Sequence, residues 1–226
     1  MSFLLEEEVL SNNTLVNVIV WSAFFIIMLI LVPFSLKRLR ENRKYKAKQE
    51  AQYQSDRLEY AHLDEKKLDA LSGEKLVEAV IYQCLRKEDE DDNYFQHLSE
   101  AEKTIYAIYQ VNQTVSSNAG LRSFFISPAS EPFLKDLVTY YKNIGAFDVA
   151  EVVRNAEILN KIMETDDDSL EKDMSPEYVT YNFSDLTHEY VTLVVGTNFT
   201  TKMAQYVEEH KEEFIERGAE DETVSR

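Results

Sequence analysis

The chain has 226 residues, a formal net charge of −17 at pH 7 and a single cysteine, Cys84. One cysteine excludes an intrachain disulfide framework and a cysteine-rich zinc site. The charge is unevenly distributed, since residues 37–48 carry a net +6 and residues 49–226 carry −20. Contact with phosphates needs clustered Lys and Arg. We therefore do not expect the acidic part of the chain to bind nucleic acid directly.

The segment 15–36 is predicted to be a membrane anchor. Its 22 residues carry no charge. A helix of that length measures about 33 Å, which is enough to cross a hydrocarbon core of about 30 Å. Its acidic front and its length argue against a cleaved signal peptide. The sequence therefore predicts a single-pass protein of the plasma membrane, with residues 1–14 as a short outer N-terminus.

A basic collar follows this segment and sets the expected orientation. Lys and Arg that flank a span stay on the cytoplasmic side, and none precedes the span here. The C-terminal domain is therefore expected in the cytoplasm. Each basic charge favours anionic headgroups by about 1 kcal/mol, whereas an acidic domain would stand off from the same surface. The collar residues are Lys37, Arg38, Arg40, Arg43 and Lys44.

The residues after the anchor have the composition of a helical stalk. Residues 37–71 are rich in Lys, Glu, Gln, Ala and Arg and contain neither Pro nor Gly. Ser72 and Gly73 are expected to end this stalk. The soluble domain is expected to cover 72–217, followed by a flexible tail at 218–226.

Apolar residues recur at spacings of three and four through most of the domain, which is the pattern of amphipathic helices. Ser99 and Glu102 have the spacing of a capping box at the start of one of them. The predicted helices cover 74–86, 99–111, 133–141, 147–163 and 199–217.

Four segments are predicted differently. The acidic stretches 88–92 and 164–173 are expected to be solvated loops. The β-branched run 186–195 leaves helix and strand equally open, and 179–183 is either one short strand or an extended link. The predicted fold class is mainly α, with one N-terminal transmembrane helix, a helical juxtamembrane stalk and a compact soluble α-helical bundle.

The stretch 118–125, Asn-Ala-Gly-Leu-Arg-Ser-Phe-Phe, resembles the signature of the DMP19-like family. That signature is roughly Asn-Gly-Gly-Phe, one or two residues, and an aromatic pair. The Ile-Gly-Ala turn at 144–146 and the closing helix at 206–214 are also similar to the family, so the resemblance covers about 74–214 and no part of the anchor. Three positions depart from the signature: Ala119 replaces the first glycine, Leu121 the phenylalanine and Ser123 a polar amide.

The resemblance implies a compact α-helical bundle. The best-known member of the family is a bacterial DNA mimic, which uses acidic surface to occupy a DNA-binding protein. Such mimicry depends on where carboxylates lie rather than on the signature, so the resemblance alone does not transfer that role to this chain.

The signature residues also have a physical interpretation. Gly120 can supply a positive φ to close a turn, and Asn118 can cap the helix that follows. Phe124 and Phe125 would then anchor the segment in the core. The alternative is a ligand or peptide pocket around Asn118 and Arg122.

The favoured function is a non-enzymatic, membrane-anchored domain whose acidic surface meets a basic protein partner in the cytoplasm. The alternatives are a DNA mimic, a small-ligand or enzymatic domain with a polar pocket near Asn118 and Arg122, and a structural part of an envelope complex. The sequence points to no catalytic residue, cofactor or metal site, since the histidines lack ligand spacing and no phosphate-binding glycine loop occurs. The candidate acidic surface comprises Glu88, Asp89, Glu90, Asp91, Asp92, Asp166, Asp167 and Asp168.

Overall fold

A computed structural model of the chain describes residue 38 and residues 41–216. By internal packing the chain divides into two compact units, Met1–Ser55 and Asp56–Arg226. The described residues of the first unit are helical. Among residues 41–216 no helix combines the length and the apolar character that a membrane span requires.

Several predictions concern residues outside this description. The anchor, the outer N-terminus and the tail all lie there, as do Lys37 and Arg40, so these predictions stay predictions. The remaining collar residues, Arg38, Arg43 and Lys44, are helical and exposed to solvent.

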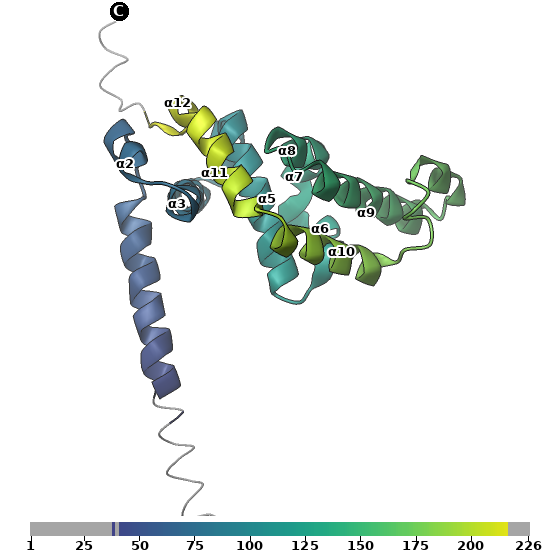
Figure 1. Cartoon of the computed structure of the whole chain (residues 1–226), viewed down its shortest axis with the longest axis horizontal. Helices are drawn as coiled ribbons and strands as arrows, with labels where there is room; N and C mark the ends of the chain where they lie inside the picture. The colour runs from purple at the N-terminus through teal and green to yellow at the C-terminus, as the bar shows by residue number, and fades with distance from the viewer. Residues whose placement is uncertain (1–37, 39–40, 217–226) are drawn as a thin grey trace, which may run out of the picture. The chain divides into compact units, whose positions relative to one another are not determined.

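The second unit consists of helices joined by short turns, and residues 41–216 contain no β-strand (Figure 1). The predicted mainly α fold is therefore confirmed for this part of the chain. In chain order the elements are α2 (Glu65–Ala70), α3 (Glu74–Glu90), α4 (Tyr94–His97), α5 (Glu100–Ser116), α6 (Gly120–Phe125), η1 (Pro128–Ser130), α7 (Glu131–Leu134), α8 (Leu137–Asn143), α9 (Phe147–Thr165), η2 (Asp168–Asp173), α10 (Phe183–Gly196), α11 (Phe199–Glu209) and α12 (Lys211–Phe214).

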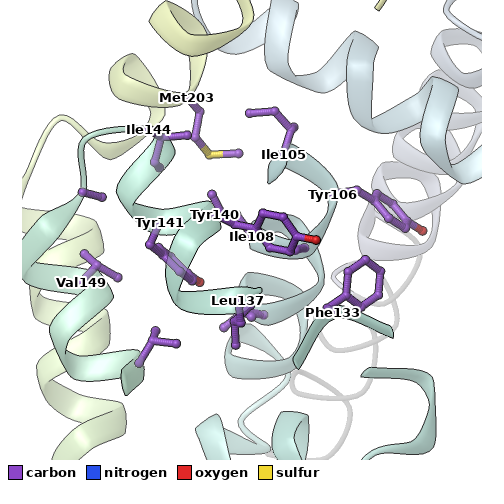
Figure 2. Close-up of a cluster of buried hydrophobic side chains, with 14 of the residues drawn as sticks. Ile105, Tyr106, Ile108, Phe133, Leu137, Tyr140, Tyr141, Ile144, Val149 and Met203 are labelled. Carbon is purple, nitrogen blue, oxygen red and sulfur yellow. The ribbon is translucent and has the colours of Figure 1, made fainter. Parts of the chain in front are cut away.

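Helix α5 is the centre of the bundle and packs against α3, α6, α8 and α12. Its start is the predicted capping box, in which the Ser99 hydroxyl accepts from the Glu102 amide at 3.1 Å and the Glu102 carboxylate accepts from the Ser99 amide at 2.9 Å. Its inner face is fully buried at Ile105, Ile108 and Val111, as the spacing predicted. Figure 2 shows Ile105 and Ile108 beside the apolar side chains of α8.

The stalk prediction is wrong at its C-terminal end. Residues 41–59 are helical, but the helix stops at Tyr60 and α2 begins only after Asp64. The side chain of Leu63, between the two, is 1% exposed, and the Asp64 carboxylate caps α2 by accepting from the Lys67 amide. Because Leu63 is buried in the second unit, the packed part of this unit begins before residue 72, where the domain was predicted to start.

The acidic run 88–92 was predicted as a loop, and this is wrong for its first three residues. Helix α3 continues through Glu90, four residues beyond the predicted end at Arg86. Adjacent carboxylates would repel one another in a helix, but Glu88, Asp89 and Glu90 each have a partner within the unit. The partners offset the repulsion and allow the helix to extend.

Other helix ends also differ from the predictions. Helix α5 runs to Ser116 instead of ending before Asn112. The helix predicted over 133–141 is divided into α7 and α8 at Asp136, where φ is −114°. The helix predicted over 199–217 is interrupted at His210, whose imidazole lies 2.9 Å from the Tyr206 carbonyl oxygen at the end of α11.

The ambiguous segments are settled in favour of helix and turn. The β-branched run 186–195 lies within α10, which starts with a capping box between Asn182 and Asp185. Residues 179–183 form a turn and the start of α10 rather than a strand. The predicted loop 164–173 is mostly the end of α9 and the short helix η2, separated by Asp166 at φ 54°.

Candidate functional site

The turn between α5 and α6 contains two residues in the left-handed region, Asn118 at φ 61° and Gly120 at φ 74°. The predicted positive φ at Gly120 is confirmed. The predicted capping role of Asn118 is wrong, since Ala119 occupies the N-cap position of α6 and no side chain caps it. The hydroxyl of Thr187 in α10 instead accepts a hydrogen bond from the Leu121 amide at 3.1 Å.

Helix α6 is anchored by its aromatic pair, as predicted. Phe124 is 1% exposed and Phe125 is 5% exposed. The Phe125 ring also contacts the Phe183 ring at the start of α10, with 6.5 Å between the ring centroids. The signature thus fixes α6 to the core and to α10.

Buried hydroxyl groups connect helix α10 to α5 and α8. The Tyr190 hydroxyl donates to the Asn112 side-chain oxygen in α5 at 2.6 Å and lies 2.8 Å from the Tyr141 hydroxyl in α8. Burial raises the pKa of both tyrosines, so both phenols stay protonated at neutral pH. Thr187, one turn earlier, donates to the Phe183 carbonyl at 2.6 Å while it accepts from α6. The two walls formed by α6 and α10 are therefore rigidly joined.

An open hollow of about 500 Å³ lies between these walls, and the signature residues Asn118, Gly120 and Arg122 are part of its lining. No Asp or Glu of the described residues lines it, although the second unit is strongly acidic. Sequence reasoning missed the α10 wall, because nothing near the signature indicates it. The full lining is Val115, Asn118, Ala119, Gly120, Arg122, Phe183, Ser184, Thr187, His188 and Val191.

Arg122 differs from the other arginines of the second unit. Of the four arginines in residues 56–216 it is the one without an ion pair to a described residue. Its side chain also has no hydrogen-bond partner there, and the residue is exposed. His188 lines the same hollow, but it also borders a smaller hollow of about 310 Å³ with Asp185 and Glu189. The uncompensated positive charge at this place is therefore that of Arg122.

The first acidic run, 88–92, is largely engaged within the unit. Burial, and then the hydrogen bond to Glu88, raise the pKa of Tyr106. Asp92 alone has no partner among residues 41–216. The pairs are Glu88 with the Tyr106 hydroxyl at 2.5 Å, Asp89 with Arg57, Glu90 with Arg86, and Asp91 with His97 at 3.2 Å.

The second acidic stretch, which we call acidic segment 164–177, is different. Its carboxylates are all exposed, and none forms an ion pair with a described residue. It includes one basic residue, Lys172. The carboxylates of the segment are Glu164, Asp166, Asp167, Asp168, Glu171, Asp173 and Glu177.

The resemblance in the signature is supported by comparison with known families. A family model described as DMP19-like protein matches residues 96–210, about half of the chain. The chain belongs to the DMP19-like family. No match was found among curated proteins or among solved structures. The matched region includes the signature turn, both walls of the hollow and acidic segment 164–177.

A larger hollow of the DMP19-like chain, about 810 Å³, lies where the beginning of the second unit meets its last described residues, and residues 62–64 and 215–216 are part of its lining. The Glu216 amide there donates to the Leu63 carbonyl at 3.1 Å. The charged groups in its wall have ion-pair or hydrogen-bond partners, and the Lys87 ammonium lies 2.6 Å from the buried carboxylate of Glu102. Gln83, which is 1% exposed, donates to Glu102 at 2.8 Å. This hollow is thus bordered by interactions that hold the bundle together.

Thiol and metal chemistry has little support in the described part of the DMP19-like chain. Cys84 is buried, and burial raises the pKa of its thiol well above the usual value. A protonated, inaccessible thiol is a poor nucleophile. Within residues 41–216 no group of three His, Cys, Asp or Glu side chains is arranged to hold a metal ion.

Proposed function

We propose that the chain is a membrane-anchored, non-enzymatic interaction domain of the DMP19-like family. It binds a basic protein partner on the cytoplasmic side of the membrane. The anchor and the orientation rest on the uncharged segment 15–36 and on the basic collar after it. The interaction itself rests on acidic segment 164–177.

The observation that carries the proposal is the contrast between the two acidic stretches. Three carboxylates of the run 88–92 form ion pairs inside the unit and a fourth accepts from a tyrosine hydroxyl. Those of acidic segment 164–177 are exposed and form no ion pair with residues 41–216, and only Glu164 and Asp167 accept hydrogen bonds there, both from residues within four positions in the sequence. Unpaired carboxylates of one sign create a field that attracts and orients a basic surface. Acidic segment 164–177 is therefore the better candidate for the contact with a partner.

A charge-matched pair of variants tests this assignment. Asp166→Asn/Asp167→Asn/Asp168→Asn neutralises the centre of the segment. Its control, Glu208→Gln/Glu209→Gln/Glu212→Gln, removes the same charge from exposed positions on α11 and α12. Proteins retained by the immobilised full-length chain are identified by mass spectrometry from about 0.15 to about 1 M salt, where the Debye length falls from about 8 Å to about 3 Å.

The proposal predicts a specific basic protein that is retained by the wild-type chain and by the control. It should be lost from the triple Asp variant and released as salt rises. If the partner is retained equally by the triple Asp variant and at high salt, an electrostatic interface at this segment is contradicted.

DNA mimicry is a special case of the same contact. It applies if the retained partner also binds DNA, because carboxylates would then occupy positions that phosphates occupy in the competing complex. Titration of the complex with duplex DNA separates the cases: displacement supports mimicry, and a stable ternary complex rules it out while leaving the protein contact intact.

A further inference from the structure

We propose that the hollow lined by Asn118 and Arg122 is a binding site for a carboxylate attached to an apolar group. This site lies between α6 and α10 and is separate from acidic segment 164–177. The inference therefore holds or fails independently of the partner proposed above.

The charge at the hollow selects an anion. Arg122 has no ion pair or hydrogen-bond partner for its side chain among residues 41–216, and no carboxylate of these residues lines the hollow. The other arginines of residues 56–216, Arg57, Arg86 and Arg154, are each paired with an Asp or Glu. A guanidinium presents a planar fork of donors that fits a carboxylate through two parallel hydrogen bonds. An incoming carboxylate would give Arg122 the kind of partner that the other arginines already have.

Two further polar groups are available beside Arg122. The Asn118 amide and the Ser184 hydroxyl line the hollow, and neither side chain is hydrogen-bonded to a described residue. Asn118 is held in the left-handed region at φ 61°, a conformation that is uncommon outside glycine. Donors of this kind can complete the coordination of a carboxylate, which accepts up to about four hydrogen bonds.

Apart from Thr187 and His188, the rest of the lining has no polar side chain, and it accounts for the second part of the ligand. Val115 is buried, and Val191 keeps 40% of its surface exposed. Phe183 provides an aromatic surface at the start of α10. A hollow of about 500 Å³ is within the size range of small-ligand sites, which combine mainly apolar walls with a few placed polar groups. A fully polar anion would leave these apolar walls in contact with water.

The walls of the hollow are also fixed before any ligand arrives. The Leu121 amide donates to Thr187, so the backbone next to Arg122 is tied directly to α10. Tyr190, one turn further along α10, is tied to α5 and α8. Binding would therefore order little more than the side chains at the rim, which limits its entropic cost.

The acidic field of the unit opposes any anion, and it limits what the site can hold. Asp185 and Glu189 line the neighbouring hollow, and His188 lines both hollows. A ligand with several negative charges would be repelled, so the geometry favours a single carboxylate. The same field is screened beyond about 8 Å at physiological salt, whereas a direct contact with Arg122 is screened much less.

The experiment is a titration of the full-length chain by calorimetry with N-acetyl-leucine and, as the charge control, with N-acetyl-leucinamide. Two variants report on the site. Arg122→Gln removes the guanidinium, and Arg122→Lys keeps the charge but loses the fork. Lys135→Gln is the matched control, because Lys135 is exposed, has no ion-pair or hydrogen-bond partner for its side chain among residues 41–216 and does not line the hollow.

The expected result is binding of the acid by the wild-type chain and by Lys135→Gln. Binding by Arg122→Gln should be weaker by roughly tenfold or more, as for the loss of a charge-assisted hydrogen bond, with Arg122→Lys between the two. The amide should bind much less well than the acid. The inference is overturned if acid and amide bind equally, if Arg122→Gln matches Lys135→Gln, or if the acid shows no binding up to about 10 mM.

A second arm distinguishes the source of the carboxylate. A tetrapeptide ending in leucine is titrated with a free and with an amidated C-terminus. If the natural ligand is a peptide C-terminus, the free peptide should bind at least as tightly as N-acetyl-leucine and the amidated one should not. If it is a free organic acid, the peptide should bind less tightly than the small acid.

Discussion

The hydroxyl oxygen of Thr187 lies close to the place that a side chain at residue 120 would occupy. A Cβ atom built on Gly120 would be 3.3 Å from this oxygen, closer than most real contacts of a Cβ atom. Gly120 also has φ 74°, which a residue with a side chain adopts only at a cost. Two separate features therefore require glycine at this position, and both are part of the wall of the Arg122 hollow.

Gly120→Ala is expected to destabilise the protein by about 1–3 kcal/mol, because the substitution adds backbone strain and a close contact with Thr187. Urea unfolding of the full-length chain, followed by circular dichroism, measures the change. The control is Gly196→Ala at the end of α10, where a new Cβ meets nothing within 4 Å. That variant should be neutral or slightly stabilising, since alanine favours helix. Equal stability of the two variants would contradict the strained turn.

Thr187→Val should separate the effect of the Thr187 hydroxyl group from the effect of the side chain's branched shape. Valine keeps a branched side chain but cannot accept from the Leu121 amide, which then loses its partner at a cost of about 1–3 kcal/mol. Thr187→Ser keeps the acceptor and loses one methyl group, for which about 0.8 kcal/mol is expected. Hydrogen exchange at Leu121 gives a local measurement, since it should accelerate in Thr187→Val and remain slow in Thr187→Ser.

The helices of the second unit could be predicted because their apolar residues recur at helical spacing and all face one core. The capping pair Ser99 and Glu102 also marked the start of α5 correctly. The breaks could not be predicted. The chain leaves its helix at Tyr60 because Leu63 is buried in the bundle, and that burial depends on helices much later in the sequence.

The candidate site shows the same division. The turn at Gly120 and the residues Asn118 and Arg122 could be selected from a local signature. The opposite wall could not, because Thr187 meets Leu121 across a separation of 66 residues. The two acidic stretches look alike in sequence, yet among the described residues only the first forms ion pairs. Its partners, such as Arg57 and Tyr106, lie on other parts of the unit.

The pair formed by Lys87 and Glu102 should contribute strongly to stability. Glu102 is 2% exposed, and Glu102→Gln would leave the ammonium group of Lys87 without its partner. We expect a loss of about 2–4 kcal/mol, less than for a fully buried pair, because the Lys87 side chain is 19% exposed. Glu100→Gln is the control, since Glu100 pairs with Lys103 at the surface and should contribute little.

The double variant Lys87→Met/Glu102→Gln tests the reason for that loss. If the cost comes from an unpaired charge, replacing Lys87 by an apolar side chain should recover a substantial part of the stability lost in Glu102→Gln. Urea unfolding of the two single variants and the double variant gives the coupling. If the losses of the two single variants were strictly additive in the double variant, the stability loss in Glu102→Gln would not come from the unpaired charge of Lys87.

The buried tyrosines predict how stability changes at alkaline pH. Burial raises the pKa of Tyr141 and Tyr190 above the ordinary value of 10.0, and it raises the pKa of Tyr140 to about 12. Above pH 10.0 the unfolded chain loses these protons while the folded chain keeps them. Their contribution to stability is therefore complete below pH 10.0 and is lost as pH rises above it, by about 1.4 kcal/mol per pH unit for each such group.

Tyr190→Phe should make the decline of stability above pH 10.0 shallower by the share of one group, as measured by urea unfolding at several alkaline pH values. Asn112→Ala is the matched control. It removes the same hydrogen bond, which is 2.6 Å long, but no ionisable group. It should lower stability at every pH and leave the slope unchanged. If tyrosinate absorbance instead appeared near pH 10.0 while the circular dichroism of the fold persisted, the phenols would be accessible and the buried Tyr141–Tyr190 pair would be wrong.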